Sequence, residues 1–302
     1  MFVLKALAFG VVVAAGIGLK QASVDDGGSA YRREIETVRA KRIERLTGPT
    51  GWLTLVGLDW LKEGRNTIGG AADNDIVIAK LPPHFGTATL ADGKVVFQMT
   101  PEAGVTLVEK AKGPMEMLDD SHEKPTTVEV GTVSFYLIHR GERYALRVKD
   151  SAAPTRTHFL GLDYFDIDPG WRIVAKWEAY DPPHEVEEPN VLGEMEKSVV
   201  PGAAVFEREG KTYRVEPIIE VPGDKDLFLV FADKTSGKET YGAARFVYTE
   251  PPKDGKVVID FNKAYNPPCA FTPYATCLLP TAQNRLAVRV TAGEKKYRGG
   301  HE

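Results

Sequence analysis

Hydrophobic and polar positions change their period once along the chain. Near the start, apolar residues recur at near-helical spacing among Arg, Lys and Glu, at Tyr31, Ile35, Val38 and Leu46. This spacing predicts one amphipathic helix over residues 31–46, which Gly48-Pro49 ends. After Pro49 the chain consists of short segments rich in β-branched and aromatic residues, separated by turn residues.

The turn residues predict three hairpins in this β-rich part. In each, two alternating segments flank a glycine-containing turn: 87–90 with 94–99, 134–139 with 143–149, and 204–208 with 211–215. Such pairs are typical of antiparallel strands. We therefore predict an all-β fold in which the N-terminal helix precedes two β-sandwich or barrel-like halves, residues 50–155 and 165–297.

Two segments of the second half do not fit short hairpins. A strand begins at Trp171, where apolar and polar residues alternate. Residues 181–202 are rich in Pro and Glu, so we expect a long connection there, of the kind that is either mobile or binds a ligand.

The first residues predict an export signal. Residues 6–19 are apolar and uncharged, with Lys5 before them and Lys20 after them. A run of this length is shorter than the roughly 20 residues that span a bilayer, but it fits the apolar part of a signal peptide. We expect residues 1–22 to direct export to the periplasm or the cell exterior. Because no clean cleavage site follows, an uncleaved membrane tether remains an alternative.

Export gives the two cysteines a context. Cys269 and Cys277 are the only cysteines, and in an oxidising compartment we expect them to form a disulfide. Closing so short a loop contributes ~2.6 kcal/mol in the loop-entropy model.

Charge and histidine spacing exclude several classes of partner. The formal net charge is −4, and no block of like charges is present, so we expect no nucleic-acid partner. The six histidines are scattered without ligand spacing, so we predict neither a metal site nor a cofactor.

A candidate site follows from strand parity in the second half. If residues 239–248 form a strand, Glu239, Tyr241 and Arg245 share one face, and in a strand over 257–262 the polar face carries Asp260 and Asn262. A hairpin between these strands would place the two polar faces together, although a slip of one residue would separate them.

Chemically, this patch predicts a ligand-binding or catalytic face. Arg245 could bind a carboxylate or phosphate, and Glu239 or Asp260 could act as a general acid or base. Ligand contacts are also expected from Tyr241, Asn262, Tyr265 and Asn266, under a proline-rich loop over residues 263–280. The alternative is a cross-strand ion pair between Arg245 and Asp260 that only stabilises the sheet.

Three stretches resemble a known family. GWLTLVGLDWLKEGRNTIGG (residues 51–70), KETYGAARFVY (238–248) and DFNKAYNPPCAFTPYATCLLPTAQNRL (260–286) look like the signature blocks of a prokaryotic family catalogued as domain of unknown function 1684. This resemblance implies no particular activity.

The first half also resembles a forkhead-associated β-sandwich, in the order of NTIGG, DIVI, LPPHFGTATL and ADGKVVF. That fold commonly reads phosphothreonine through an Arg after the Ile-Gly pair and a Ser-Arg before a His. Gly70 and Pro82-Pro83 stand in those places here, and only His84 matches. The resemblance therefore implies the architecture rather than phosphopeptide binding.

These observations favour an exported binding or accessory protein for a small polar or anionic ligand. One alternative is a hydrolase or lyase that uses Glu239 or Asp260. Another is a structural envelope protein whose first half contacts a protein partner. A membrane would be contacted only through an uncleaved leader.

Overall fold

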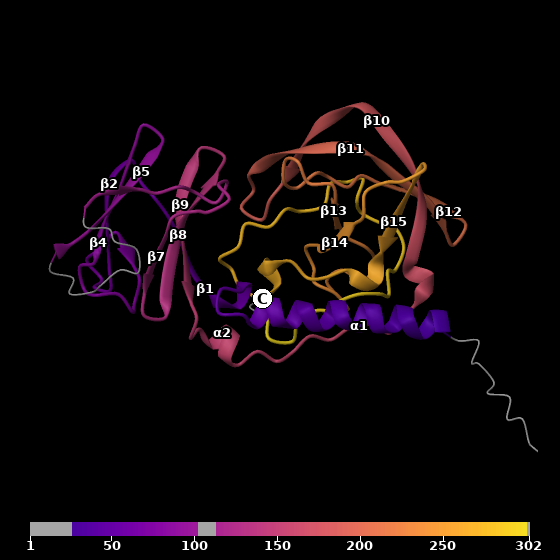
Figure 1. The fold of residues 1–302 in the computed structure, drawn as a ribbon, viewed down its shortest axis with the longest axis horizontal. Helices are drawn as coiled ribbons and strands as arrows, with labels where there is room; N and C mark the ends of the chain where they lie inside the picture. The colour runs from indigo at the N-terminus through magenta and orange to yellow at the C-terminus, as the bar shows by residue number, and fades with distance from the viewer. Residues whose placement is uncertain (1–25, 102–112, 301–302) are drawn as a thin grey trace, which may run out of the picture.

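The computed structural model describes residues 26–101 and 113–300. The strands form two lobes, which the segment 151–171 connects (Figure 1). The predicted signal peptide, residues 1–22, lies outside the described residues.

The predicted N-terminal helix is confirmed as α1 (Asp26–Thr47), which lies along the second lobe in Figure 1. Ile35 and Leu46 are fully buried against that lobe. After α1 the chain turns back so closely that a Cβ at Gly51 would lie 2.4 Å from the carbonyl oxygen of Leu46, so only glycine fits there. Within the described residues, no helix has the length and hydropathy that a bilayer span requires.

The first lobe is a β-sandwich of two sheets, with strand orders β3-β2-β4-β5-β6 and β1-β9-β8-β7. Both sheets contribute to one core, in which the rings of Phe85, Phe97 and Phe135 contact one another. The strands are β1 (Leu55–Trp60), β2 (Gly64–Gly69), β3 (Ile76–Val77), β4 (Gly86–Ala91), β5 (Lys94–Met99), β6 (Met115–Glu116), β7 (Thr127–Val130), β8 (Val133–Arg140) and β9 (Arg143–Asp150).

The second lobe contains a four-stranded sheet, β12-β11-β10-β15, and a two-stranded sheet, β13-β14. Both bury side chains in one core around Trp171, Phe206, Phe231 and Phe261. The strands are β10 (Arg172–Pro189), β11 (Met195–Arg208), β12 (Lys211–Val215), β13 (Leu227–Phe231), β14 (Arg245–Thr249) and β15 (Lys256–Asp260). Short helical turns are α2 (Pro154–Thr157), η1 (Trp52–Thr54), η3 (Pro169–Trp171), η4 (Phe261–Lys263) and η5 (Pro268–Ala270).

All three predicted hairpins are confirmed, as β4–β5, β8–β9 and β11–β12. The long connection expected over residues 181–202 is wrong, because β10 continues to Pro189 and pairs with β11 from Met195 onward. The two prolines that suggested a loop, Pro182 and Pro183, lie where the register shifts between Ala179 and His184. A bulge accommodates prolines without ending the strand pair.

The hairpin expected between residues 239–248 and 257–262 is also wrong. β14 begins only at Arg245 and pairs with β13, so that Arg245 lies opposite Phe231. β15 pairs with β10, so that Asp260 lies opposite Arg172. The long strand β10 offers a second edge to β15, and the apolar strand β13 pairs with β14 instead.

Candidate functional site

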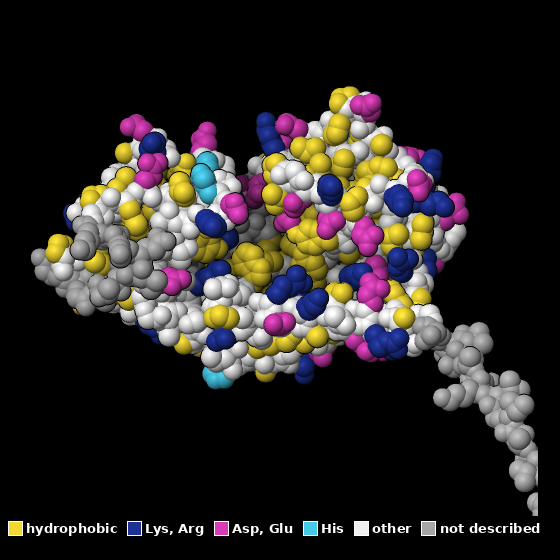
Figure 2. Space-filling view, viewed as in Figure 1, with side chains coloured by type: hydrophobic (Ala, Val, Ile, Leu, Met, Phe, Trp, Pro, Cys, Tyr) yellow, Lys and Arg dark blue, Asp and Glu magenta, His cyan; other side chains and the backbone are white. Residues whose placement is uncertain are grey.

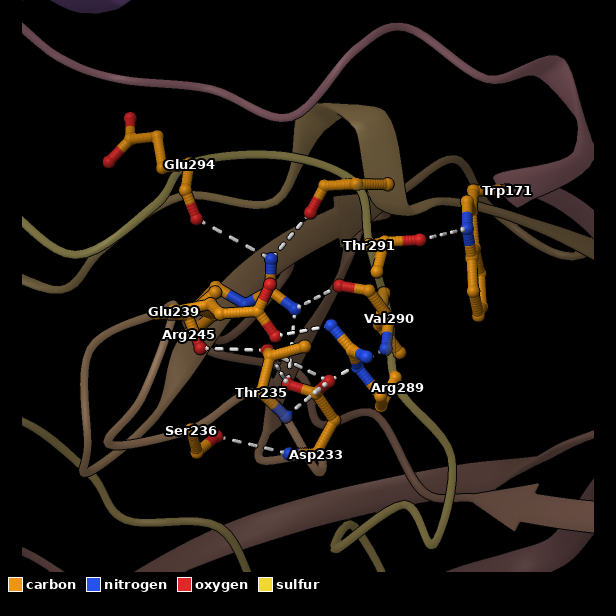
Figure 3. Close-up of polar contacts among 12 residues, drawn as sticks. Trp171, Asp233, Thr235, Ser236, Glu239, Arg245, Arg289, Val290, Thr291 and Glu294 are labelled. Carbon is orange, nitrogen blue, oxygen red and sulfur yellow. Dashed lines mark hydrogen bonds and ion pairs between the residues drawn. The ribbon is translucent and has the colours of Figure 1, made fainter.

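Arg245 lies in a buried polar network that holds the C-terminal segment of the chain (Figure 3). Its Nη2 donates to Asp233 Oδ1 at 3.1 Å and to the carbonyl oxygen of Val290 at 2.9 Å, and its Nη1 donates to the carbonyl oxygen of Ala292. Asp233 Oδ2 accepts from the Val290 amide at 2.7 Å. Arg245 and Asp233 therefore satisfy backbone groups of a segment without a strand partner, and Arg245 is committed to the fold rather than to a ligand.

Glu239 does not join this buried network through its own carboxylate. It forms an ion pair of 2.6 Å with Arg289 on the surface, where its side chain is 40% exposed. Residues 239–244 precede β14 in turns. The predicted patch of Glu239, Arg245 and Asp260 is therefore divided among separate environments.

Asp260 and Asn262 anchor helix α1. Tyr31 in α1 donates its hydroxyl to Asp260 Oδ1 at 2.9 Å, and Asn262 Nδ2 donates to the same hydroxyl oxygen at 2.9 Å. Burial raises the pKa of Tyr31, and the hydrogen bond to Asp260 adds to this shift. Asp260 Oδ1 is thus engaged by Tyr31 and Asn262, whereas its buried Oδ2 has no hydrogen-bond partner among the described residues.

Asn266 and Tyr265 belong to a second anchor of α1. Arg42 donates from Nε to Glu294 Oε1 at 3.0 Å and from Nη2 to the carbonyl oxygen of Asn266 at 2.7 Å, while its guanidinium lies 4.7 Å from the centre of the Tyr265 ring. Burial raises the pKa of Glu294, and Arg42 opposes that shift. These buried contacts fix α1 by polar groups as well as by Ile35 and Leu46.

The disulfide expected between Cys269 and Cys277 is present, with Cα atoms 6.3 Å apart. It closes a loop whose two ends are each held by a hydrogen bond from another part of the second lobe. Tyr241 donates its hydroxyl to the carbonyl oxygen of Cys269 at 3.1 Å, and the amide of Val191, at the tip of the β10–β11 hairpin, donates to the carbonyl oxygen of Cys277 at 2.9 Å. The loop is therefore a stiff platform, and Tyr241 supports it.

Ser121, His122 and Asp119 also lie together, in the first lobe. A Ser-His-Asp catalytic relay requires the serine and the carboxylate to contact opposite ring nitrogens. Here both Asp119 Oδ1, at 3.4 Å, and Ser121 Oγ, at 3.5 Å, approach His122 Nδ1, and the serine donates directly to Asp119. This cluster is not a relay. No group of three or more metal-ligating acidic, His or Cys side chains is arranged to hold a metal in residues 26–101 and 113–300.

A row of cations faces the second lobe from strands β8 and β9. Alternate residues of β9 share a side of the sheet, and opposite it Leu146 and Val148 pack into the core of the first lobe. We call this row, Arg140, Arg143, Arg147 and Lys149, the cationic face. Arg140 and Arg147 both donate to Thr276 Oγ1 at 3.2 Å, and Arg143 pairs with Glu194 at 3.0 Å. The face therefore lies at the boundary between the lobes.

Two of these cations have carboxylate partners and two do not. Arg140 binds both carboxylate oxygens of Asp120, at 3.0 and 2.7 Å, and Arg143 binds Glu194. Arg147 and Lys149 form no ion pair with any carboxylate of the described residues. Arg147 is nevertheless only 3% exposed, and its Nε has no hydrogen-bond partner.

Lys149 lies two residues after Arg147, on the same side of β9. Burial lowers the pKa of Lys149, and the positive charge of Arg147 lowers it further. Its Nζ donates to the carbonyl oxygen of Thr50 at 2.8 Å. The Trp52 ring, which is 37% exposed, lies 5.7 Å from the Arg147 guanidinium. The uncompensated pair is thus bordered by a partly open aromatic side chain.

Figure 2 shows a hollow between the two lobes, with hydrophobic side chains in its floor and both basic and acidic side chains around it. We call this hollow the inter-lobe cleft. The contacts of Arg140, Arg143 and Arg147 with the second lobe place the cationic face at this boundary.

Sequence reasoning missed this site. The signal was present, because Arg143, Arg147 and Lys149 fall at alternating positions of a predicted strand. Alternation alone does not distinguish a solvated strand face from one that a second lobe covers, and the partner Thr276 lies 129 residues away from Arg147.

A comparison with protein families supports the resemblance to domain of unknown function 1684 for two of the three stretches. Residues 157–295 match the model of the family described as "Protein of unknown function (DUF1684)". This range includes the stretches 238–248 and 260–286, whereas the stretch 51–70 lies outside it. No curated protein matches the chain.

Among solved structures, the chain is similar to an uncharacterized protein of Haloarcula marismortui, determined by solution NMR. The two share 31% sequence identity over 46% of this chain and 78% of that chain, with a TM-score of 0.40. Through residues 157–295, the chain belongs to the DUF1684 family of proteins of unknown function.

Proposed function

We propose that the protein binds a small anionic ligand in the inter-lobe cleft, at Arg147. The observation that carries this proposal is the burial of Arg147 without a carboxylate partner in the described residues. A buried charge is costly unless it is both paired with an opposite charge and hydrogen-bonded, since its hydration is lost. An anionic ligand would supply the missing partner.

The loop around Thr276 supports the same proposal. Thr276 is adjacent to Cys277 in the disulfide-closed loop, so its hydroxyl is held on a stiff element. Pre-organised polar groups lose little freedom when a ligand binds, which favours affinity. A binding function is preferred to that of a hydrolase or lyase because the two acid–base candidates, Glu239 and Asp260, contact Arg289 and Tyr31.

Binding can be tested by isothermal titration of the purified protein with benzoate and with phenyl phosphate at low ionic strength. We expect at least one of them to bind the unmodified protein. Arg147→Gln should weaken that binding by about tenfold or more, because a charge-assisted hydrogen bond is lost.

Arg143→Gln is the matched control, since it removes the same charge from the same strand face. Glu194 already neutralises Arg143, so this variant should keep the affinity within about threefold. Absence of binding by both compounds, or equal losses in the two variants, would reject the proposal. No binding would favour a structural envelope protein whose first lobe contacts a protein partner.

In this proposal the protein acts outside the cytoplasm. The disulfide is compatible with an oxidising compartment. Fractionation of cells that express the full chain, followed by N-terminal sequencing, should place the protein in the periplasm or medium without its first residues. Recovery with the membrane and an intact N-terminus would indicate the tether instead.

A further inference from the structure

The uncompensated cations of the cationic face also specify the charge of the ligand. We propose that the inter-lobe cleft recognises a dianionic phosphoryl group, as in a small phosphate monoester, in preference to a single carboxylate. This inference rests on the proposed function and adds a chemical class to it.

Arg147 supplies the first positive charge and a directional donor set. Its Nη2 donates to Thr276, and its buried Nε donates to no described group. A guanidinium presents planar N–H donors that match the oxygens of a phosphate or carboxylate. The free Nε–H therefore indicates that the ligand carries an oxygen acceptor. It does not by itself distinguish a phosphate from a carboxylate.

Lys149 supplies the second positive charge, and this charge favours a phosphate monoester over a carboxylate. It lies two residues from Arg147 on the same strand face, and its Nζ has only a backbone carbonyl oxygen as hydrogen-bond acceptor among the described residues. A monocarboxylate would balance one of the two charges and leave the other half-buried. A phosphate monoester, which carries about two negative charges above its second pKa of about 6, would balance both.

The neighbouring cations do not change this count. Asp120 binds Arg140 through both carboxylate oxygens, and Glu194 binds Arg143. Both ion pairs are complete without a ligand. A further carboxylate, that of Glu196, acts on Arg140 and accepts from Asn190. Among the four cations of this face, Arg147 and Lys149 are therefore the two without an ion-pair partner in the described residues.

Thr276 adds a neutral donor at the same place. A hydroxyl has one O–H donor and two acceptor sites. Arg140 Nε and Arg147 Nη2 both donate to Thr276 Oγ1 at 3.2 Å. Because both acceptor sites are used, the O–H remains to donate, and a phosphoryl group has an additional oxygen to accept it.

The test compares phenyl phosphate with benzoate, which share a ring and differ in head group. At pH 7.5 we expect phenyl phosphate to bind about tenfold more tightly or better, because it adds one elementary charge near two cations. Lys149→Gln should remove most of this preference by weakening phenyl phosphate about tenfold, while benzoate changes by less than about threefold.

Lys176→Gln is the matched control, because it removes the same charge from an exposed position of β10. It should leave both affinities unchanged. Thermal unfolding of each variant shows whether it is folded. Benzoate and phenyl phosphate binding equally, with both dependent on Arg147, would overturn the dianion inference and leave the proposed function intact.

Two further results are decisive. A phosphate preference that persists in Lys149→Gln would overturn the role of Lys149 in setting ligand charge. Failure of both compounds to bind the unmodified protein would reject the proposed function, and with it this inference.

Discussion

Arg147 Nη2 and Thr276 Oγ1 lie 3.2 Å apart although 129 residues separate them in the chain. Arg147 comes from a strand of the first lobe, and Thr276 comes from the disulfide-closed loop of the second. The contact therefore joins the lobes at the proposed ligand site. The position of the threonine hydroxyl depends on the conformation of its loop.

Removal of the disulfide should lower both stability and ligand affinity. The double variant Cys269→Ser, Cys277→Ser is expected to lose about 2.5 kcal/mol of unfolding free energy, because the unfolded chain regains the freedom of a short loop. Urea denaturation at neutral pH measures this loss. Phenyl phosphate titration of the folded variant should show weaker binding, since Thr276 is no longer held in place. An unchanged denaturation midpoint and affinity would contradict this role of the loop.

Asp233→Asn should destabilise the second lobe strongly. Arg245 would remain buried with its ion-pair partner gone, which costs about 3–5 kcal/mol in comparable buried pairs. Urea denaturation gives the magnitude. Glu239→Gln is the control, because it breaks an exposed ion pair with Arg289 that contributes at most about 1 kcal/mol. Similar losses in the two variants would show that the buried network does not carry the stability assigned to it.

Tyr31→Phe should loosen helix α1 without emptying any space in the core. The change removes a hydroxyl that donates to Asp260 Oδ1 and accepts from Asn262, and it leaves that buried carboxylate oxygen with only the two donors of Asn262. We expect a loss of about 0.5–1.5 kcal/mol, the net contribution of a hydrogen bond whose acceptor keeps other donors. Hydrogen exchange should be faster in residues 27–47 than in the unmodified protein. Tyr213→Phe, which removes a hydroxyl with no hydrogen bond among the described residues, should leave exchange in α1 unchanged.

Glu188→Gln should stabilise the protein at neutral pH and have little effect in acid. Glu188 is 1% exposed, its Oε2 has no hydrogen-bond partner among described groups, and Glu196 lies opposite it on β11. Burial raises the pKa of Glu188 above its ordinary value of 4.5, and the charge of Glu196 adds to the shift. Its contribution to stability is thus present below pH 4.5 and is lost as pH rises through the raised pKa.

The measurement is the unfolding free energy of both proteins in urea at several pH values between 4 and 8. The difference in favour of Glu188→Gln should grow as pH rises. Glu187→Gln, an exposed neighbour on β10, should show no such trend. A difference that does not depend on pH would exclude titration of Glu188 as its cause.

Local sequence patterns predicted where the strands lie better than which strands pair with one another. The hairpins at Asp92-Gly93 and Glu209-Gly210 could be predicted because the turn residues that determine them lie next to the two strands in the sequence. The partner of β15 is different, because β10 begins 84 residues before it and nothing in either strand identifies the other. An alternation that continues through Pro182 and Pro183 was also obscured by the prolines themselves.

For the candidate site, the sequence identified polar residues that are buried, but it predicted the wrong partners for them. Asp260, Asn262 and Asn266 are buried polar residues, as a binding site would require, yet their partners lie in α1. Parity predicts which side of a strand a residue faces, and not what covers that side. For the same reason the sequence did not identify Arg147, because the loop that contacts it comes from the other lobe.

Helix α1 determines where this chain can be divided into fragments. The family match begins at residue 157, but the side chains that cap Asp260 and Glu294 come from Tyr31 and Arg42. A fragment cut at the start of the match would expose the buried carboxylates of Asp260 and Glu294 to water, and we expect it to fold poorly until a peptide of residues 26–47 is added in trans. On this expectation the smallest fragment that folds alone would be discontinuous, with the sandwich of the first lobe inserted between its two pieces.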